Sequence, residues 1–390
     1  MSLNDTPNAN RFHIGFFGQR NAGKSSLVNA ILGQDHSVVS DTPGTTTDPV
    51  NKAMELLPIG PVLLTDTAGL DDSGSLGEKR IGKTYEILRK TDLAVLVADG
   101  VKGLSEDDRS LIRQFESRNL PHLTVFTKLD LLSAAPPERE GELYVSCRDG
   151  TNIQKLKDML GAVAADHKKE TTIVSDLLQS GDMVILVVPI DKAAPKGRLI
   201  LPQQMVIRDL LDGGMIPLVC KETELEKALS SLQSKPAMVI TDSQVFGKVA
   251  ALLPDDLPLT SFSVLMARFK GTLEQSLEGA DRLDHLTDGA RILIAEGCTH
   301  HRQCGDIGTE KLPALIRSYT GIFPDFSYTS GTGYPSDLSS YDLIIHCGGC
   351  MLGEKEMLYR MQQAMDAHIP FTNYGIAIAK MNGILSRICF

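Results

Sequence analysis

Two short clusters of metal-binding residues lie in the last quarter of this 390-residue chain. Cys298-Thr299-His300 is followed, after a long gap, by His346-Cys347-Gly348-Gly349-Cys350. Thiolate and imidazole are common ligands of zinc, and thiolates hold iron–sulfur clusters. The Cys-x-x-Cys pair alone would also suit a redox dithiol, but Cys298 and the flanking histidines favour a metal. The spacing leaves open a closed zinc site of three Cys and one His or a 4Fe-4S cluster held by three thiolates.

A second chemical motif lies near the N-terminus. The segment Gly18-Gln19-Arg20-Asn21-Ala22-Gly23-Lys24-Ser25 matches the P-loop pattern, between an apolar run at 12–17 and a helical pattern at 24–32. Backbone N–H groups of such a loop wrap nucleotide phosphates, the Lys reaches the terminal ones, and the Ser ligates magnesium. We therefore assign nucleotide binding to Gly18, Asn21, Ala22, Gly23, Lys24, Ser25 and Ser26, with Ser25 as a magnesium ligand.

Three later segments indicate that the nucleotide is GTP. In Asp66-Thr67-Ala68-Gly69, Asp66 would hold magnesium through water and the Gly69 N–H would contact the γ-phosphate. In Thr127-Lys128-Leu129-Asp130, the Asp130 carboxylate would accept hydrogen bonds from guanine N1 and N2, a donor pair that adenine lacks. Thr127 stands where many GTPases have Asn, which should weaken support of the base modestly. Ser146-Cys147 resembles the last base-binding loop, with Cys147 expected to pack rather than to ligate.

These motifs resemble bacterial GTPases of the tRNA-modification and Era-like branch. Gly44-Thr45-Thr46-Thr47-Asp48 is similar to the first switch of that branch, which implies that Thr46 senses magnesium. Asn21 matches an Asn that holds a potassium ion in the tRNA-modifying relatives, where such an ion takes the place of an arginine finger. Leu70 replaces the catalytic Gln of Ras-like switches, and Glu78 is a weak candidate for water activation. We expect slow, potassium-stimulated GTP hydrolysis with Lys24, Thr46 and Gly69 as catalytic residues.

The elements around these motifs predict an α/β fold. Near-continuous apolar strands alternate with amphipathic helices up to about residue 165, which indicates a mostly parallel sheet covered on both faces. A middle segment repeats the α/β rhythm without a chemical motif, and we interpret it as a spacer or dimerisation module. Residues 274–288 are charged and are expected to form an exposed connection. The expected order is a P-loop GTPase domain followed by two smaller α/β domains, at 1–168, 173–280 and 287–390.

Each of the two cysteine clusters follows a predicted strand, and this placement predicts that the clusters lie close together. Cys298 follows the apolar run 291–296, and Cys347 follows the apolar run 343–345. Because sites in open α/β sheets gather at the carboxyl ends of strands, we expect both clusters at one edge of a sheet.

The cysteine region is similar to the iron–iron hydrogenase maturation GTPases, the HydF family. The likeness is carried by Cys-x-His, a long gap and His-Cys-x-x-Cys, and it extends to 305–308, 341–351 and 372–375. It implies a cytoplasmic scaffold that binds a 4Fe-4S cluster through Cys298, Cys347 and Cys350, with His300 and His346 as possible ligands of the fourth iron. It also implies a transient diiron precursor as cargo, two radical-SAM maturases and apo iron–iron hydrogenase as partners, and a homodimer formed by the middle domain.

Composition limits the alternatives. A formal net charge of −10 disfavours nucleic acid as the main partner, because phosphate neutralisation needs a basic face. Apolar content of 42% is ordinary for a soluble protein, and neither a signal peptide nor a membrane span is expected. The main alternative is a ribosome- or RNA-associated Era-like GTPase with an accessory zinc or redox domain. A redox regulator, in which Cys347 and Cys350 form a reversible disulfide, is a third.

Overall fold

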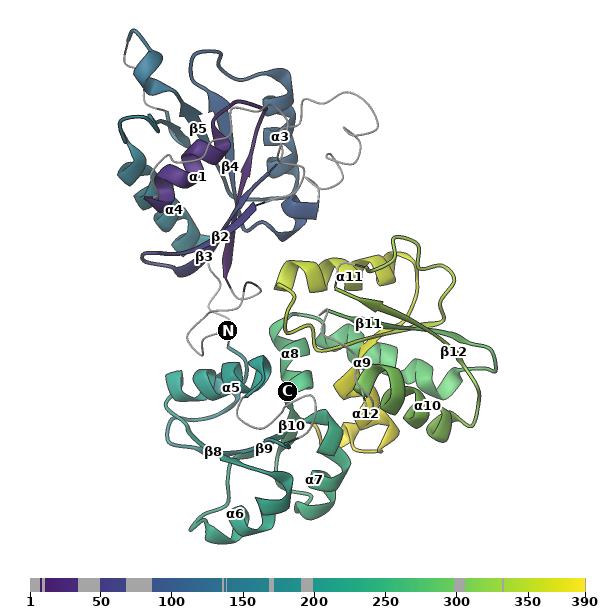
Figure 1. Ribbon diagram of the computed structural model, residues 1–390. Helices are drawn as coiled ribbons and strands as arrows, with labels where there is room; N and C mark the ends of the chain where they lie inside the picture. The colour runs from purple at the N-terminus through teal and green to yellow at the C-terminus, as the bar shows by residue number, and fades with distance from the viewer. Residues whose placement is uncertain are drawn as a thin grey trace. The chain divides into compact units, whose positions relative to one another are not determined.

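The computed structural model divides the chain into two compact units, Met1–Glu170 and Thr171–Phe390 (Figure 1). The structure describes residue 8 and residues 11–33, 50–67, 86–134, 137, 139–167, 172–190, 199–297, 306–331 and 333–389. None of the helices in these ranges is long and apolar enough to cross a membrane. Each unit is an α/β structure, as predicted.

The first unit is built on a six-stranded sheet in the order β2-β3-β1-β4-β5-β6. Only the pair β2–β3 is antiparallel. The strands are β1 (Phe12–Phe17), β2 (Val50–Leu56), β3 (Gly60–Asp66), β4 (Leu93–Asp99), β5 (His122–Thr127) and β6 (Glu142–Tyr144). The central strand β4 is fully apolar until its last residue, because both of its faces are covered.

Helices cover both faces of this sheet (Figure 1). Helices α1 (Lys24–Leu32) and α4 (Ile153–His167) pack on one face, and α3 (Glu106–Ser117) packs on the other. The short turn η2 (Leu129–Leu131) follows β5. The predicted nucleotide motifs lie at the carboxyl ends of β1, β3, β5 and β6. These strands run parallel in one sheet, which places the motifs at the same edge of that sheet.

The second unit contains two four-stranded parallel sheets, in the orders β10-β9-β7-β8 and β12-β11-β13-β14. The strands of the first are β7 (Met183–Val187), β8 (Ile216–Cys220), β9 (Met238–Thr241) and β10 (Leu259–Ser261). Those of the second are β11 (Arg291–Glu296), β12 (Asp325–Ser330), β13 (Leu343–His346) and β14 (Phe371–Asn373). The helices are α5 (Leu201–Asp212), α6 (Leu225–Ser231), α7 (Phe246–Leu252), α8 (Phe262–Phe269), α9 (Leu273–Ala280), α10 (Leu312–Thr320), α11 (Glu354–Asp366) and α12 (Tyr374–Met381).

Shared packing joins the two sheets of the second unit. Ile376 and Ala379 of α12, which follows the second sheet, lie in the same apolar cluster as Ile185 and Val239 of the first sheet. Near the C-terminus, the Cys389 N–H donates to the carbonyl of Leu259 at 3.0 Å. The two sheets of the second unit therefore share part of one apolar core. The proposed limits of the individual domains remain a prediction.

The expectation of an exposed connection at residues 274–288 was wrong. This stretch forms most of α9 and the 3-10 helix η6 (Asp281–His285). One face of α9 is buried, and the Thr372 hydroxyl donates to the carbonyl of Ser276 at 2.7 Å. The charged residues of α9 lie on the outer face, so the high charge of the segment marks an amphipathic helix rather than a loop.

Candidate nucleotide and metal sites

The P-loop joins β1 to α1 in a conformation that needs glycine. Gly18 has φ of +137°, and a Cβ there would lie 2.1 Å from the Val97 carbonyl oxygen of β4. Helix α1 begins at Lys24, so its first unpaired N–H groups face the loop. Such N–H groups and the positive end of the helix dipole bind anions such as phosphate.

Lys24, Ser25 and Asp66 meet at this edge of the sheet. The buried Lys24 ammonium donates to the carbonyls of Gly18, at 2.9 Å, and Gln19, at 2.7 Å. The Ser25 hydroxyl donates to Asp66 Oδ2 at 2.5 Å, while the buried Asp66 Oδ1 has no hydrogen-bond partner among the described residues. Burial raises the pKa of Asp66, against the opposing effects of Ser25 and Lys24. A buried carboxylate oxygen without a partner, beside a hydroxyl, is a fitting place for a hydrated magnesium ion.

Thr127 ties the base-binding loop to the P-loop. Its hydroxyl lies 2.6 Å from the Ala22 carbonyl and 3.2 Å from the Ala98 carbonyl, and the side chain is buried. The Thr127 hydroxyl therefore links the base-binding loop to the P-loop. Many GTPases have the longer side chain of Asn at this position. Lys128 follows in a left-handed conformation, and its ammonium pairs with Asp99 Oδ2 at 2.6 Å.

Ser146 supports the carboxylate that is expected to recognise guanine. Its hydroxyl donates to Asp130 Oδ1 at 3.0 Å, so the two predicted base-binding residues are brought together. The neighbouring Cys147 packs against the apolar core of the first unit. Burial, with a smaller effect of the Asp130 charge, raises the pKa of the Cys147 thiol to about 11, so it stays protonated at neutral pH.

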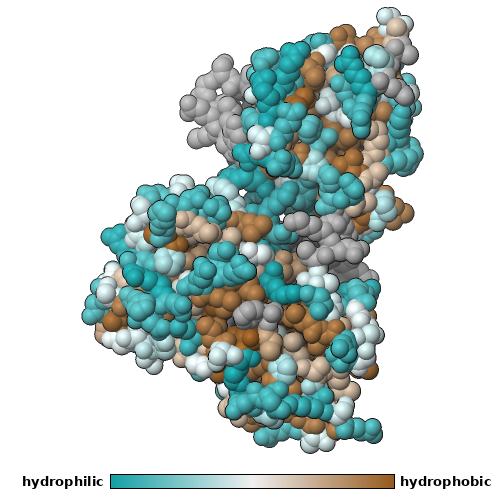
Figure 2. Space-filling view, turned by 180° about the vertical axis from the view of Figure 1, so that it is seen from behind, coloured by the Kyte–Doolittle hydropathy of each residue, from teal (hydrophilic) through white to brown (hydrophobic). Residues whose placement is uncertain are grey.

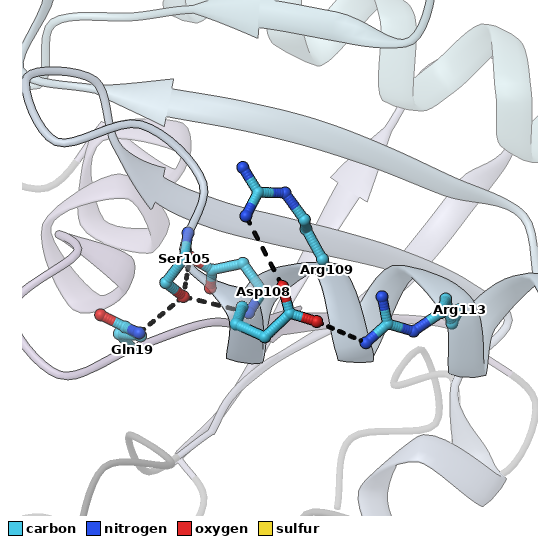
Figure 3. A network of polar contacts seen from close by, with 6 residues as sticks. Gln19, Ser105, Asp108, Arg109 and Arg113 are labelled. Carbon is cyan, nitrogen blue, oxygen red and sulfur yellow. Dashed lines mark hydrogen bonds and ion pairs between the residues drawn. The ribbon is translucent and has the colours of Figure 1, made fainter.

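The sequence analysis missed a contact between the P-loop and α3. Gln19 Nε2 donates to Ser105 Oγ at 2.6 Å, and Ser105 caps α3 in a reciprocal capping box with Asp108 (Figure 3). Beside this contact lies a cavity of about 140 Å³, lined by P-loop residues and by the turn between β4 and α3. The Ser-x-x-Asp pattern predicts the helix start, but nothing in it predicts the partner Gln19.

The second candidate site lies where β11 and β13 end side by side. These strands are parallel neighbours, with Ala295 opposite His346, and the Cys347 N–H donates to the Ala295 carbonyl at 2.8 Å. The Gly297 N–H donates to Cys347 Sγ at 3.1 Å. Gly297, the residue directly before Cys298 in the sequence, is therefore hydrogen-bonded to Cys347.

The loop that carries Cys347 and Cys350 is shaped by glycine. Gly349 has φ of +61°, and its N–H makes a second, longer contact of 3.4 Å to Cys347 Sγ. Burial raises the pKa of the Cys347 thiol to about 11, although the two N–H donors act in the opposite direction. Burial also raises the pKa of Cys350, and the positive charge of Lys270 opposes that effect.

His346 is buried and uses both ring nitrogens within the chain. Arg360 Nη1 lies 3.1 Å from Nε2, and Nδ1 lies 2.8 Å from the Cys347 carbonyl. Because a guanidinium only donates, Nε2 accepts and Nδ1 carries the proton. Burial first, and the Arg360 charge second, lower the pKa of His346 to about 3, so the ring is neutral. To ligate iron as predicted, His346 would have to give up at least one of these hydrogen bonds.

Several predicted site residues lie outside the part of the chain that the structure describes. They are Thr46, Gly69, Leu70 and Glu78 of the nucleotide site, and Cys298 and His300 of the metal site. Within the described residues, no three His, Cys, Asp or Glu side chains are gathered as ligands of a metal ion. Of the cysteine site, the structure describes Cys347, Cys350 and Gly297, which is the residue before Cys298.

Family models match almost the whole chain. The hydrogen maturase F dimerization domain matches residues 173–271, and the hydrogen maturase F tetramerization domain matches residues 274–389. A 50S ribosome-binding GTPase model matches residues 13–128. The chain belongs to the hydrogen maturase F family. This confirms the resemblance found in the sequence, and it makes this hydrogen maturase F chain a P-loop GTPase joined to self-association domains.

Curated relatives match the GTPase part of the hydrogen maturase F chain. The tRNA modification GTPase MnmE of Nitrosomonas europaea is 40% identical over 149 residues, which are 37% of this chain and 32% of that protein. GTPase Der of Kosmotoga olearia is 34% identical over 187 residues, or 42% of each chain. The chain therefore spans well under half the length of these relatives.

Solved structures resemble the GTPase fold only distantly. An Era variant from Aquifex aeolicus, bound to GDP and aluminium fluoride, is 18% identical with a TM-score of 0.36, covering 54% of this chain and 93% of that one.

Proposed function

We propose that this hydrogen maturase F chain is a GTP-hydrolysing scaffold that carries a 4Fe-4S cluster on Cys298, Cys347 and Cys350. It receives or completes a diiron precursor as cargo and delivers it to apo iron–iron hydrogenase, with two radical-SAM maturases acting before it. The observation that carries the cluster site is the Gly297 N–H bond to Cys347 Sγ, which brings the residue before Cys298 against the second cysteine cluster.

The described residues fit a cluster of this kind. Cys347 and Cys350 lie on one short loop, and two backbone N–H groups donate to Cys347 Sγ. N–H donors to sulfur stabilise the negative charge that thiolate and sulfide carry. A cluster held by three thiolates offers one iron with an exchangeable position, which suits a carrier. His300 stays a candidate for that position, whereas His346 is better suited to holding the Cys347 loop through its carbonyl.

The nucleotide site supports GTP hydrolysis in the first unit. Lys24 and the P-loop N–H groups would bind the phosphates, while Ser25 and Asp66 would hold magnesium. Thr46 and Gly69 are proposed to close on the γ-phosphate, and Asn21 to hold a potassium ion against it. Hydrolysis would then change the order of these switch segments, which is the usual way in which a GTPase alters its affinity for partners.

Anaerobic reconstitution tests the scaffold proposal. With iron and sulfide, the wild-type chain should gain about four irons and four sulfides per chain, as a 4Fe-4S cluster requires. Cys298→Ala, Cys347→Ala and Cys350→Ala should each lower that content and abolish activation of apo-hydrogenase. Cys389→Ala is the matched control, since Cys389 packs in an apolar cluster distant in sequence from the motif. A colourless protein that binds one zinc would contradict the proposal.

A ribosome- or RNA-associated GTPase is the second candidate. It is favoured by the match of residues 13–128 to a 50S ribosome-binding GTPase model and by the likeness to a tRNA modification GTPase. Co-sedimentation with ribosomes that depends on GTP and survives physiological salt would support it. Loss of that association in Lys24→Ala would tie it to the nucleotide site.

A further inference from the structure

Helix α8, from the part of the chain that matches the dimerization domain, lies directly against the cysteine loop. A Cβ added to Gly348 would lie 3.6 Å from Ser263 Oγ and 3.9 Å from Met266 Cβ. Lys270, one residue beyond the end of α8, donates from its ammonium to the Leu352 carbonyl at 2.9 Å. Because Ser263, Met266 and Lys270 are spaced by three and four residues, one face of the helix meets the loop from Gly348 to Leu352.

The Lys270 ammonium is almost completely buried. The residue is 2% exposed, and among the described residues its ammonium otherwise contacts the Phe269 ring, with 5.2 Å to the ring centroid. No carboxylate lies within ion-pair distance of it among the described residues. In the part of the chain that the structure describes, Glu354, in the first turn of α11, and Cys350, when it is ionised, act on this ammonium electrostatically. Burying an ammonium without a counter-charge is costly, and here burial lowers the pKa of Lys270.

A thiolate at Cys350 would add a second negative charge, beside that of Glu354, to the surroundings of the buried ammonium. The neutral Cys350 thiol leaves the ammonium poorly compensated, whereas a metal-bound thiolate places a negative charge in the same buried region. The interaction is reciprocal, since the ammonium lowers the energy of the thiolate just as the thiolate lowers that of the ammonium.

We propose that Lys270 is a positioning and charge-compensating residue of the cysteine site, holding the loop through Leu352 and stabilising the thiolate of Cys350. This inference rests on the proposed metal-binding function and adds to it that the dimerization part of the chain contributes a residue to the site. A cation beside a cluster stabilises the added electron, so Lys270 should also raise the reduction potential. Loss of its charge should therefore weaken metal binding and make the cluster harder to reduce.

Three substitutions separate charge from hydrogen bonding. Lys270→Gln keeps a donor for the Leu352 carbonyl but removes the charge, Lys270→Met removes both, and Lys270→Arg keeps the charge. Lys235→Met is the control, because Lys235 is an exposed lysine in the same part of the chain. Each full-length chain is titrated anaerobically with Co²⁺, using the thiolate-to-cobalt absorption, and its reconstituted cluster is titrated redox-potentiometrically. Far-UV circular dichroism confirms that each variant is folded.

Lys270→Gln and Lys270→Met should bind Co²⁺ about 10- to 100-fold more weakly, the usual effect of losing an outer partner of a metal ligand. Both should have a more negative cluster potential, while Lys270→Arg and Lys235→Met stay near wild type. A folded Lys270→Gln chain with wild-type affinity and potential would overturn the inference, even if Lys270→Met proved too unstable to purify. If the wild-type chain bound neither Co²⁺ nor a cluster, the proposed cluster function itself would fail, whatever the variants did.

Discussion

At the scale of single residues, base selection depends on the carboxylate of Asp130. Ser146 holds one of its oxygens at 3.0 Å, so the side chain is oriented before the nucleotide binds. Asp130→Asn replaces one acceptor by an N–H₂ donor, which suits the O2 carbonyl of xanthine and repels the N2 amine of guanine. We expect GTP affinity to fall by about 100-fold or more and XTP to be hydrolysed instead, because two hydrogen bonds to a charged group are lost.

Competition binding with fluorescent GDP against GTP and XTP measures this change. Asp158→Asn is the matched control, because Asp158 is exposed on α4 and accepts a hydrogen bond from Gln154 rather than contacting the base-binding residues. Unchanged GTP affinity in Asp130→Asn would exclude Asp130 as the guanine-binding group.

Asn21 carries the prediction of potassium dependence. It lies exposed in the P-loop with φ of +61°, a conformation that Asn tolerates better than most residues. If its carboxamide oxygen binds potassium beside the phosphates, GTP hydrolysis should be roughly tenfold or more faster in potassium than in sodium, because a fixed cation stabilises developing charge. Steady-state phosphate release in the two salts, at equal ionic strength, measures the ratio. Asn21→Ala should bring the two rates together, and equal rates in the wild-type chain would refute the potassium prediction.

Residues whose type and spacing are imposed by chemistry could be found in the sequence. Lys24, Ser25, Asp66 and Asp130 are of this kind. Ser25 contacts Asp66 and Ser146 contacts Asp130, while the roles of these residues in nucleotide binding stay predictions. Residues that act through distant contacts could not be found, since a contact such as Gln19 with Ser105 or Lys270 with Leu352 is created only by the packing of separate elements. Gln19 and Lys270 have no spacing that marks them.

At the scale of elements, the strands buried on both faces were the ones that the sequence predicted well. The apolar runs at 12–17 and 291–296 match β1 and β11 to the residue. The edge strands β2 and β12 were missed because at least half of each strand is polar or exposed. The exposed edge strand β8 was missed for a different reason, since it is mostly apolar but short and contains Pro217.

Arg360 joins three elements around the metal site. From α11, its guanidinium contacts His346 Nε2 of β13 at 3.1 Å and donates to the Gly331 carbonyl after β12 at 2.6 Å. It also pairs with Glu356 at 2.9 Å, and it is 1% exposed. Arg360→Met should lower the free energy of unfolding by about 3 kcal/mol, because a buried carboxylate, a carbonyl and an imidazole lose their donor together.

Urea denaturation followed by circular dichroism measures this loss. Arg317→Met is the matched control, because Arg317 lies on α10 over the Phe326 ring and its substitution leaves no buried anion without a partner. A change in Arg360→Met no larger than in the control would mean that the guanidinium network adds nothing to stability.

At the scale of the whole molecule, the second unit packs the part that matches the dimerization domain against the part that carries the cysteine loop. The dimerization and tetramerization models meet between residues 271 and 274, yet α8 and α12 pack across that boundary. Helix α8 thus connects the part that matches the dimerization domain to the cysteine loop inside the second unit. Nothing in the sequence pattern indicated this, because the middle segment carries no chemical motif of its own.

Among the described residues of the second unit, the edge strand β8 exposes an apolar surface that could bind a partner. Ile216 and Val219 are 53% and 47% exposed, and Leu211 at the end of α5 is 53% exposed (Figure 2 shows apolar side chains gathered on one face of this unit). An unpaired, apolar strand edge pairs readily with another chain, and two copies of the same edge can meet about a twofold axis.

Val219→Lys should therefore shift the chain from an assembly of several copies toward the monomer, because the interface would have to bury a charge on each side. Native mass spectrometry across a range of protein concentrations measures the populations. Val101→Lys is the matched control, since Val101 is 56% exposed and belongs to the GTPase unit, outside the residues that match the dimerization domain. If Val219→Lys keeps the wild-type assembly, β8 is not the interface. If assembly is lost while cluster content stays at the wild-type level, the cysteine site is complete within one chain.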